Sequence, residues 1–237
     1  MKTDNMKNVV IWGDSVAKGV VLDDVKGRYV ITKDSAAATF AAKTGVNLIN
    51  RSRMGMTSAD GQKQLEYDME RGIVADTALI GFGGNDSDFD WSAVSQSPDA
   101  EHLPKSTLPV FESNMRSMIE ALLKRNVTVV VPTLPPVLSE KYFAFFTHGG
   151  ISHNKTLNGS NILRWLGGYD TIASFHDRYS EVIRRLVKEY ALKPVDLFSA
   201  FSAQKDLHSF YCSDGIHPNE KGQKLIARVM LETLLPA

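Results

Sequence analysis

Three residues near the two ends of the chain have the types needed for nucleophilic catalysis. Ser15 follows a short apolar run and Gly13 in the sequence VVIWGDSVAKG, and Asp214 and His217 stand three residues apart in CSDGIHPNEKG. A carboxylate beside an imidazole can hold the ring in one orientation, while the other ring nitrogen accepts a proton from a serine hydroxyl. An Asp-x-x-His pair alone more often caps a helix, so this interpretation also requires donors for a developing negative charge.

Two further segments could supply such donors. Residues 81–86 read GFGGND, so Asn85 offers a side-chain amide directly after an apolar run. Residues 53–58 read RMGMTS, in which Gly55 could turn a backbone N–H toward the same place. Both patterns also have ordinary explanations, because Gly-Asn-Asp is common in Asx turns and a glycine often ends a strand. Their value depends on whether the fold brings them to the serine.

Apolar runs of strand length alternate with amphipathic stretches along the chain. The runs predict strands at residues 9–12, 46–49, 78–82, 127–132 and 194–198. The stretches predict helices at residues 35–44, 58–71, 108–125, 172–190 and 220–235. This alternation predicts an α/β fold with a five-stranded, doubly wound parallel sheet. Residues 16–21 also favour a helix, which would place Ser15 at a strand-to-helix turn on the carboxyl edge of the sheet.

Residues 86–107 and 138–170 do not fit the alternation and are predicted to be insertions. Segments this long without strand or helix signals usually form lids or binding walls in a compact domain. Four aromatic residues gather in the second insertion: Tyr142, Phe143, Phe145 and Phe146. They predict either a satellite core or dimer patch, or a surface that faces substrate, and the sequence does not decide between these alternatives.

The composition bounds the class of protein. Among 237 residues, Lys plus Arg and Asp plus Glu are 27 each, so no basic field predicts binding to nucleic acid or to anionic membranes. The first residues lack the apolar core of a signal peptide, and no apolar stretch reaches the roughly 20 residues of a membrane span. The single cysteine, Cys212, excludes an intrachain disulfide. With no repeat or linker, the sequence predicts one cytoplasmic domain over residues 1–237.

The remaining acidic residues and histidines predict no second site. Asp86, Asp88 and Asp90 alternate as in a calcium-binding loop, but the positions of that loop's glycine and bidentate glutamate hold a tryptophan and a serine. The sequence therefore predicts no metal site. His176 is followed directly by Asp177, a pair that is typical of the start of an exposed helix.

The four motifs occur together in an order known from one family. The first motif is Gly-Asp-Ser, and it is followed by a glycine after the second strand, Gly-x-Asn-Asp after the third strand and Asp-x-x-His before the last helix. With these motifs in this order, the sequence resembles the SGNH (GDSL) hydrolases. The resemblance covers nearly the whole chain and implies a flavodoxin-like three-layer α/β/α fold and esterase or acylhydrolase activity. It implies that Ser15 is the nucleophile, His217 the general base and Asp214 the acid that orients the base. It also implies an oxyanion hole formed by the N–H groups of Ser15 and Gly55 and the Asn85 side chain, with no metal or organic cofactor.

The resemblance leaves the small-molecule ester substrate open. Trp91 and Trp165 in the insertions favour a short-acyl ester such as an O-acetyl group on a carbohydrate, because flat rings stack on sugars. Apolar residues of the second insertion would instead line the channel of a lipid or thioester acylhydrolase, namely Phe143, Phe145, Phe146, Leu163 and Leu166. A binding module that kept the fold without catalysis is a third interpretation. The aromatic segment 142–146 is also the one feature that points to a homodimer.

Overall fold

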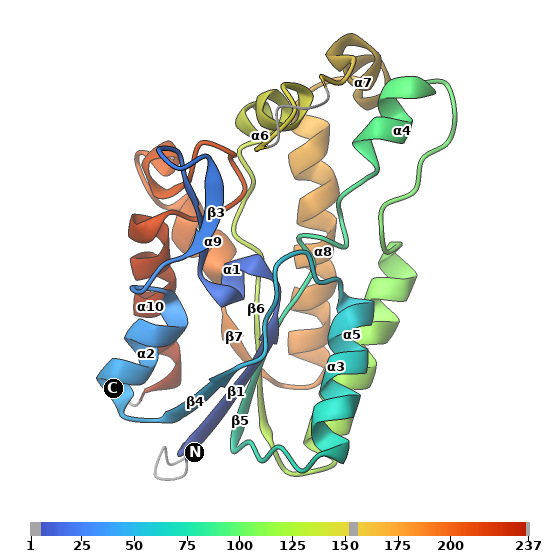
Figure 1. The fold of residues 1–237 in the computed structure, drawn as a ribbon. Helices are drawn as coiled ribbons and strands as arrows, with labels where there is room; N and C mark the ends of the chain where they lie inside the picture. Colours follow the sequence, from blue (N-terminus) through green and yellow to red (C-terminus); the bar gives the residue numbers. More distant parts are fainter. Residues whose placement is uncertain (1–5, 152–155, 236–237) are drawn as a thin grey trace.

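The computed structural model describes residues 6–151 and 156–235, and its centre is a five-stranded parallel sheet (Figure 1). The strands are β1 (Asn8–Gly13), β4 (Asn47–Asn50), β5 (Thr77–Gly81), β6 (Thr128–Pro132) and β7 (Lys193–Val195). Their order in the sheet is β4-β1-β5-β6-β7. In the register, Ile11 of β1 lies between Asn50 of β4 and Leu79 of β5. All five predicted strands belong to this sheet, and their order is the flavodoxin-like one.

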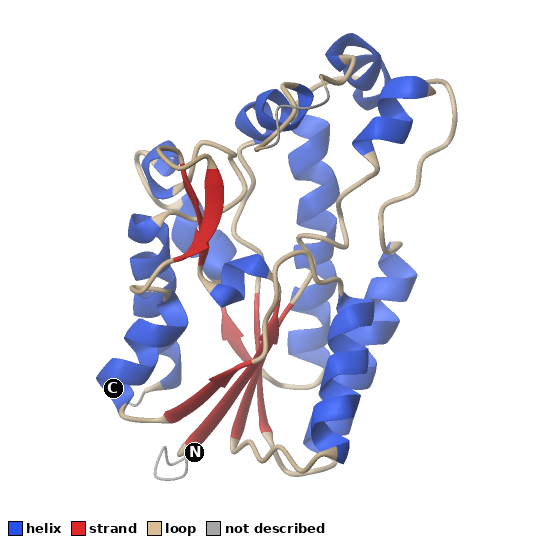
Figure 2. Cartoon of the chain, viewed as in Figure 1, coloured by secondary structure: helices blue, strands red, loops and turns tan. Residues whose placement is uncertain are grey.

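Helices cover both faces of the sheet, which gives three layers (Figure 2). One face carries α3 (Ser58–Glu70), α5 (Leu108–Leu123) and α8 (Asp170–Glu189), and the other carries α2 (Ala36–Thr44) and α10 (Glu220–Leu234). Along β1, Val10 and Trp12 belong to the first core, whereas Val9 and Ile11 belong to the second. Because the central strands β1, β5 and β6 are buried on both faces, they are largely apolar runs, and this explains why the sequence predicts them well.

The chain after β1 departs from the predicted helix over residues 16–21. Helix α1 (Ser15–Lys18) is a single turn that ends at Gly19. The next residues form an antiparallel hairpin of β2 (Val20–Asp23) and β3 (Arg28–Ile31). Apolar and β-branched residues on both sides of a short polar turn are a hairpin signal, and here this signal is stronger than the helical one.

The predicted strand over residues 194–198 is correct only as far as Val195. Asp196 then caps α9 (Leu197–Ser202), because its side chain accepts a hydrogen bond from Ser199 N–H at 3.1 Å. A side-chain acceptor at this position satisfies a free N–H of the first helical turn, so the apolar residues that follow continue as a helix.

The two insertions fold into short helices beyond the carboxyl edge of the sheet (Figure 1). They are α4 (Trp91–Gln96) in the first insertion and α6 (Ser139–Thr147) and α7 (Gly159–Leu166) in the second. Their apolar side chains form a separate small core, to which Phe89, Trp91 and Phe143 contribute. The prediction of a satellite core is therefore correct for Phe143. Residues 152–155 of the second insertion lie outside the described residues.

Candidate active site

Ser15 lies where β1 meets α1, at the carboxyl edge of the sheet. A side chain at Gly13 would place a Cβ 2.6 Å from Ala17 Cβ and 2.9 Å from a carbonyl oxygen of β5, so a glycine is needed for α1 to pack this closely. The Asp14 side chain accepts a hydrogen bond from Val16 N–H at 2.9 Å and starts α1. The chain leaves β1 toward one neighbouring strand and returns to β5 on its other side, which is the kind of crevice where α/β sheets bind ligands.

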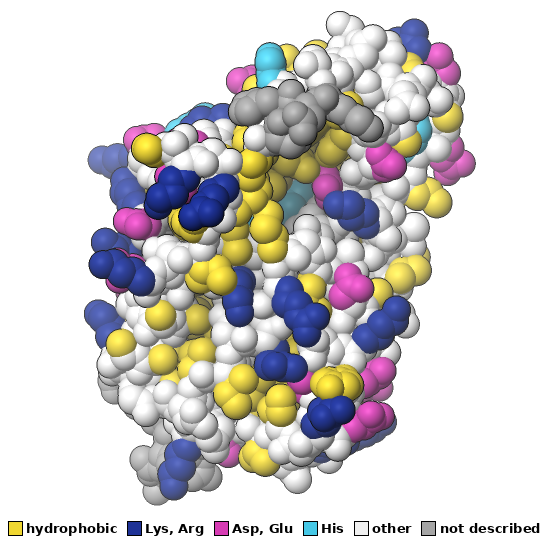
Figure 3. Space-filling model, viewed as in Figure 1, with side chains coloured by type: hydrophobic (Ala, Val, Ile, Leu, Met, Phe, Trp, Pro, Cys, Tyr) yellow, Lys and Arg dark blue, Asp and Glu magenta, His cyan; other side chains and the backbone are white. Residues whose placement is uncertain are grey.

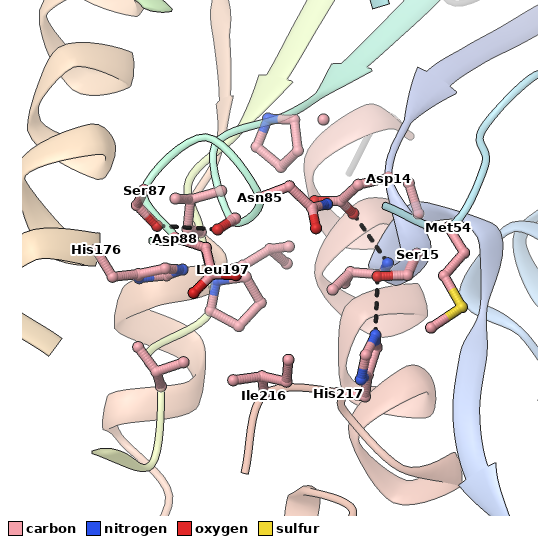
Figure 4. A pocket seen from close by; sticks show the side chains of 18 of the residues that line it. Asp14, Ser15, Met54, Asn85, Ser87, Asp88, His176, Leu197, Ile216 and His217 are labelled. Atoms are coloured by element: carbon pink, nitrogen blue, oxygen red, sulfur yellow. Dashed lines mark hydrogen bonds between the residues drawn. The ribbon is translucent and has the colours of Figure 1, made fainter. Parts of the chain in front are cut away.

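Asp214 and His217 reach Ser15 from the loop between the 3₁₀ turn Leu207–Phe210 and α10. The backbone N–H groups of Ile216 and His217 each donate to Asp214 Oδ1 at 3.0 Å, which fixes the turn between them. His217 Nδ1 donates to Asp214 Oδ2 at 2.7 Å, and His217 Nε2 lies 2.8 Å from Ser15 Oγ (Figure 4). All three side chains are buried. The structure therefore brings these predicted residues together as a continuous Ser–His–Asp chain of hydrogen bonds.

Tyr29 of β3 is a site residue that the sequence analysis misses. Its hydroxyl donates to Asp214 Oδ2 at 3.0 Å, the same oxygen that accepts from His217. Its ring packs against the His217 ring with centroids 4.8 Å apart. The hairpin is also tied to this loop by Leu22 N–H, which donates to Cys212 Sγ at 3.2 Å. The hairpin pattern could have revealed the strand, but no sequence signal identifies the partner of this tyrosine.

The charges at the site follow from burial and hydrogen bonding. Burial raises the pKa of Asp14 to about 6, although the hydrogen bond from Val16 N–H and the nearby His217 oppose the rise. Burial alone would also raise the pKa of Asp214. The hydrogen bonds from His217 outweigh this effect and hold the pKa of the Asp214 carboxyl below its usual value. Burial and the Asp214 charge raise the pKa of Tyr29, so its hydroxyl remains a donor. At neutral pH the Asp214 carboxylate that is hydrogen-bonded to the His217 ring is therefore ionised.

The three predicted oxyanion donors line one pocket. The backbone N–H groups of Ser15 and Gly55 donate to none of the described residues. Gly55 has a φ of +79°, a conformation that favours glycine. Asn85 Nδ2 donates one hydrogen to the Met56 carbonyl oxygen at 3.1 Å, which fixes the amide and leaves its second hydrogen for the pocket. The structure thus gathers two backbone donors and one side-chain donor beside the serine hydroxyl.

Buried polar residues hold the loops of Gly55 and Asn85 together. Asp86 accepts hydrogen bonds from Ser58 N–H at 3.0 Å and from Ser58 Oγ at 2.6 Å, which joins the loop after β5 to the start of α3. Asn114 Nδ2 of α5 donates to Ser58 Oγ at 3.0 Å. The sequence places this aspartate at the end of the Gly-x-Asn-Asp motif and in the rejected calcium-loop pattern, and gives no sign of its anchoring contacts.

The sequence profile of the GDSL-like lipase/acylhydrolase family matches residues 11–225, which include every predicted site residue. The chain belongs to this family. A curated relative, the GDSL esterase/lipase WDL1 of Oryza sativa subsp. japonica, is 29% identical over 161 residues, which make up 67% of this chain and 53% of that protein. The chain spans 53% to 63% of the length of the first curated relatives that it matches.

Solved structures share the fold of this GDSL-family chain. The lipase/acylhydrolase from Enterococcus faecalis matches with a TM-score of 0.65 at 20% identity, over 96% of this chain and 94% of that one. A mutant acetyl-xylooligosaccharide esterase from Geobacillus matches with a TM-score of 0.63 at 18% identity, over 100% of this chain and 98% of that one. At these identities the likeness shows the fold alone.

The GDSL-family site opens into a pocket of about 350 Å³. Figure 3 shows hydrophobic side chains gathered in a hollow below the insertion helices. Part of the lining comes from core residues between the sheet and the helices α2 and α10, namely Ile11, Leu79, Ile226 and Met230. Other lining residues come from α8 and from the insertions. The pocket therefore has an apolar inner part and an outer wall built by segments beyond the core fold.

The aromatic residues of the insertions only partly meet the predictions. Trp91, Phe145 and Phe146 line the pocket, but Trp91 stacks on Phe146 with centroids 4.6 Å apart and is largely buried. Trp165 does not line the pocket and packs against Phe89 at a centroid distance of 5.0 Å. Phe143, Leu163 and Leu166 also lie outside the lining. The insertions thus shape the outer wall mainly through the α6 segment and Trp91.

Among the described residues, no three His, Cys, Asp or Glu side chains gather as a set of metal ligands. The three alternating carboxylates have separate partners instead: Asp86 bonds Ser58, Asp88 pairs with Lys105, and Asp90 caps α4. Within residues 6–151 and 156–235, no helix has the length and apolarity needed to cross a bilayer.

Proposed function

We propose that this chain is a serine esterase that cleaves a carboxylic ester through an acyl-enzyme on Ser15. The observation that carries the proposal is the hydrogen-bonded chain from Ser15 Oγ through His217 to Asp214, which opens into the pocket. Serine alone is a weak nucleophile, and an adjacent base held by a buried carboxylate is what activates it.

The proposed reaction has two steps that use only side chains and water. His217 Nε2 takes the proton of Ser15 Oγ as the oxygen attacks the ester carbonyl carbon. The resulting oxyanion accepts hydrogen bonds from the N–H groups of Ser15 and Gly55 and from Asn85 Nδ2. The imidazolium then gives its proton to the leaving alcohol, and water, activated in the same way, releases the acid. Asp214 stabilises the imidazolium in both steps and stays ionised because its pKa is lowered.

We infer that the substrate is a short-acyl ester of a carbohydrate, such as an O-acetyl group. The pocket of about 350 Å³ leaves room for an alcohol half much larger than acetyl, and its wall carries polar groups as well as aromatic rings. The fold of this chain is also that of an acetyl-xylooligosaccharide esterase. Stacking on Trp165 no longer supports the proposal, since this ring does not line the pocket.

A lipid or thioester acylhydrolase is the second candidate, and one observation favours it. The core residues Ile11, Leu79, Ile226 and Met230 give the pocket an apolar inner part that would accept a longer acyl chain. The cytoplasmic location, the homodimer and the single domain stay predictions from the sequence.

Hydrolysis of p-nitrophenyl acetate, butyrate and octanoate by wild type and Ser15→Ala tests the proposal. Ser202→Ala, an exposed serine at the end of α9, is the matched control. We expect hydrolysis of acetate to exceed that of octanoate, and Ser15→Ala to lose activity by at least about 10⁴-fold while the control keeps it. A rate that rises with chain length would favour the second candidate. Equal activity of Ser15→Ala and wild type would refute the nucleophile. No hydrolysis and no labelling of Ser15 by a fluorophosphonate would leave a binding module.

A further inference from the structure

His176 is a buried histidine of the pocket that the proposed reaction does not use. It lies in the N-terminal half of α8 and only 8% of it is exposed, so the prediction that it lies at an exposed helix start is wrong in the exposure. Ile172 and Phe175, on the same side of this helix, also line the pocket. In Figure 4 the His176 ring points into the pocket from the side opposite Ser15 and His217.

Neither ring nitrogen of His176 hydrogen-bonds a described residue, and Nδ1 is fully buried without a partner. Asp177 Oδ1 lies 3.9 Å from Nδ1 and is likewise buried without a partner. This separation is too long for a hydrogen bond, and an imidazole with its proton on Nδ1, the nitrogen nearer Asp177, presents Nε2 as an acceptor. A buried polar group without a partner costs stability, so it needs an explanation.

The neighbouring polar side chains of this wall are already satisfied. Asp88 Oδ1 accepts from Trp91 Nε1 at 2.8 Å and from the Tyr142 hydroxyl at 2.9 Å, and Oδ2 pairs with Lys105 Nζ at 2.9 Å. Ser87 Oγ donates to a backbone carbonyl at 2.9 Å. On this side of the pocket, within the described part of the chain, Asp88 and Ser87 are thus each hydrogen-bonded, whereas the His176 ring has no hydrogen-bond partner.

We propose that His176 recognises the alcohol half of the substrate by accepting a hydrogen bond from a hydroxyl group of that alcohol. The inference rests on the proposed esterase function and narrows it to esters of polyhydroxylated alcohols such as sugars. The acyl half has an apolar place in the inner part of the pocket, lined by Ile11 and Met230. The alcohol half must then lie toward the opposite wall, where a buried acceptor without a partner in the protein favours an alcohol that carries a hydroxyl over one that does not.

Two acetate esters of equal ring size test this role: a mono-O-acetylated methyl pyranoside and cyclohexyl acetate, which carries no hydroxyl. Steady-state kinetics compare wild type, His176→Phe and His176→Gln, with the exposed His208→Gln as control. Phenylalanine keeps the ring and removes the acceptor, whereas glutamine keeps a polar end. We expect His176→Phe to lower kcat/KM on the sugar ester about tenfold, mainly through KM, and to change cyclohexyl acetate less than about twofold. His176→Gln should retain part of the preference, and His208→Gln all of it.

An equal loss on both esters would show that His176 only supports the wall, and an unchanged His176→Phe would show that it does not contact substrate. A wild type without preference for the sugar ester would also overturn the inference. Failure of the proposed function is distinguishable, because Ser15 would then neither be labelled by a fluorophosphonate nor support hydrolysis of p-nitrophenyl acetate. With Ser15 labelled and that ester cleaved, a missing sugar preference overturns the role of His176 alone.

Discussion

Replacing Asp14 by asparagine should stabilise the protein at neutral pH and slow its reaction. Asp14 is only 5% exposed, and burial raises its pKa from 3.8 to about 6. Asparagine caps helices as well as aspartate does, so Asp14→Asn keeps an acceptor for Val16 N–H and removes only the charge. The substitution therefore isolates the cost of holding an ionised carboxylate beside Ser15, the proposed nucleophile.

The size and sign of the effect follow from the two pKa values. They differ by about two pH units at about 1.4 kcal/mol each, so ionised Asp14 lowers the free energy of unfolding by about 3 kcal/mol. Between about pH 4 and pH 6 the folded protein binds this proton more tightly than the unfolded chain, so wild-type stability falls as pH rises through this window. We expect Asp14→Asn to exceed wild type by about 3 kcal/mol above pH 6 and to match it below about pH 4.

Urea unfolding of both proteins at pH 4, 5, 6 and 7.5 measures this gap, with the exposed Asp34→Asn as control. The reasoning would be refuted if the difference in the free energy of unfolding between variant and wild type did not change with pH. It would also be refuted if the variant were less stable than wild type above pH 6. At neutral pH, where Asp14→Asn should be more stable than wild type, it should hydrolyse p-nitrophenyl acetate more slowly. The Asp14 charge interacts favourably with protonated His217, the form that the ring takes during the reaction, so the variant should be slower.

Two further substitutions test the site around the triad. Asn85→Ala should fold normally by circular dichroism but lose about 10²–10³ in kcat on p-nitrophenyl acetate, because one of three oxyanion donors is removed; a loss confined to KM would contradict this role. Tyr29→Phe should lower kcat on p-nitrophenyl acetate about tenfold, because Asp214 Oδ2 loses the 3.0 Å hydrogen bond that helps to hold it beside His217. Tyr67→Phe, at an exposed tyrosine of α3, should leave kcat unchanged, and an unchanged kcat in Tyr29→Phe would reduce the role of this hydroxyl to packing.

The sheet could be predicted because its strands carry a signal of their own. A parallel strand covered on both faces is a continuous apolar run, as in β1, β5 and β6, and each apolar run predicted from the sequence overlaps a strand of the sheet. The hairpin after α1 could not be predicted in the same way, because its strands are four residues each and follow directly from a helical turn. The helices of residues 86–107 and 138–170 could not be predicted, because they are stabilised by contacts between these two segments and their neighbours, such as that of Phe89 with Trp165.

The site residues also fall into two groups, those that a sequence motif marks and those that only the folded chain reveals. Ser15, Asn85 and His217 could be predicted because their motifs follow strands or precede a helix in a fixed order, and the topology then brings them together. Tyr29 could not, because its partner is 185 residues away and the contact exists only in the folded chain. His176 was misjudged for a related reason. The helical pattern shows that it lies on a helix, but only the packing of the insertions around α8 buries it in the pocket.

Two of the buried polar groups that cost stability lie at the pocket, although Ser52 Oγ, which does not line it, is also buried without a partner. Away from the pocket, Asp68 is buried but accepts hydrogen bonds from Trp12 and Arg51, and these hold its pKa below the usual value despite burial. At the pocket, Asp14 keeps a raised pKa and His176 keeps an unpaired ring. A fold selected for stability alone would pair these groups or replace them by apolar ones. Both destabilising features face the cavity that contains Ser15, where a substrate hydroxyl would pair with His176 and the imidazolium of the proposed reaction would offset the charge of Asp14.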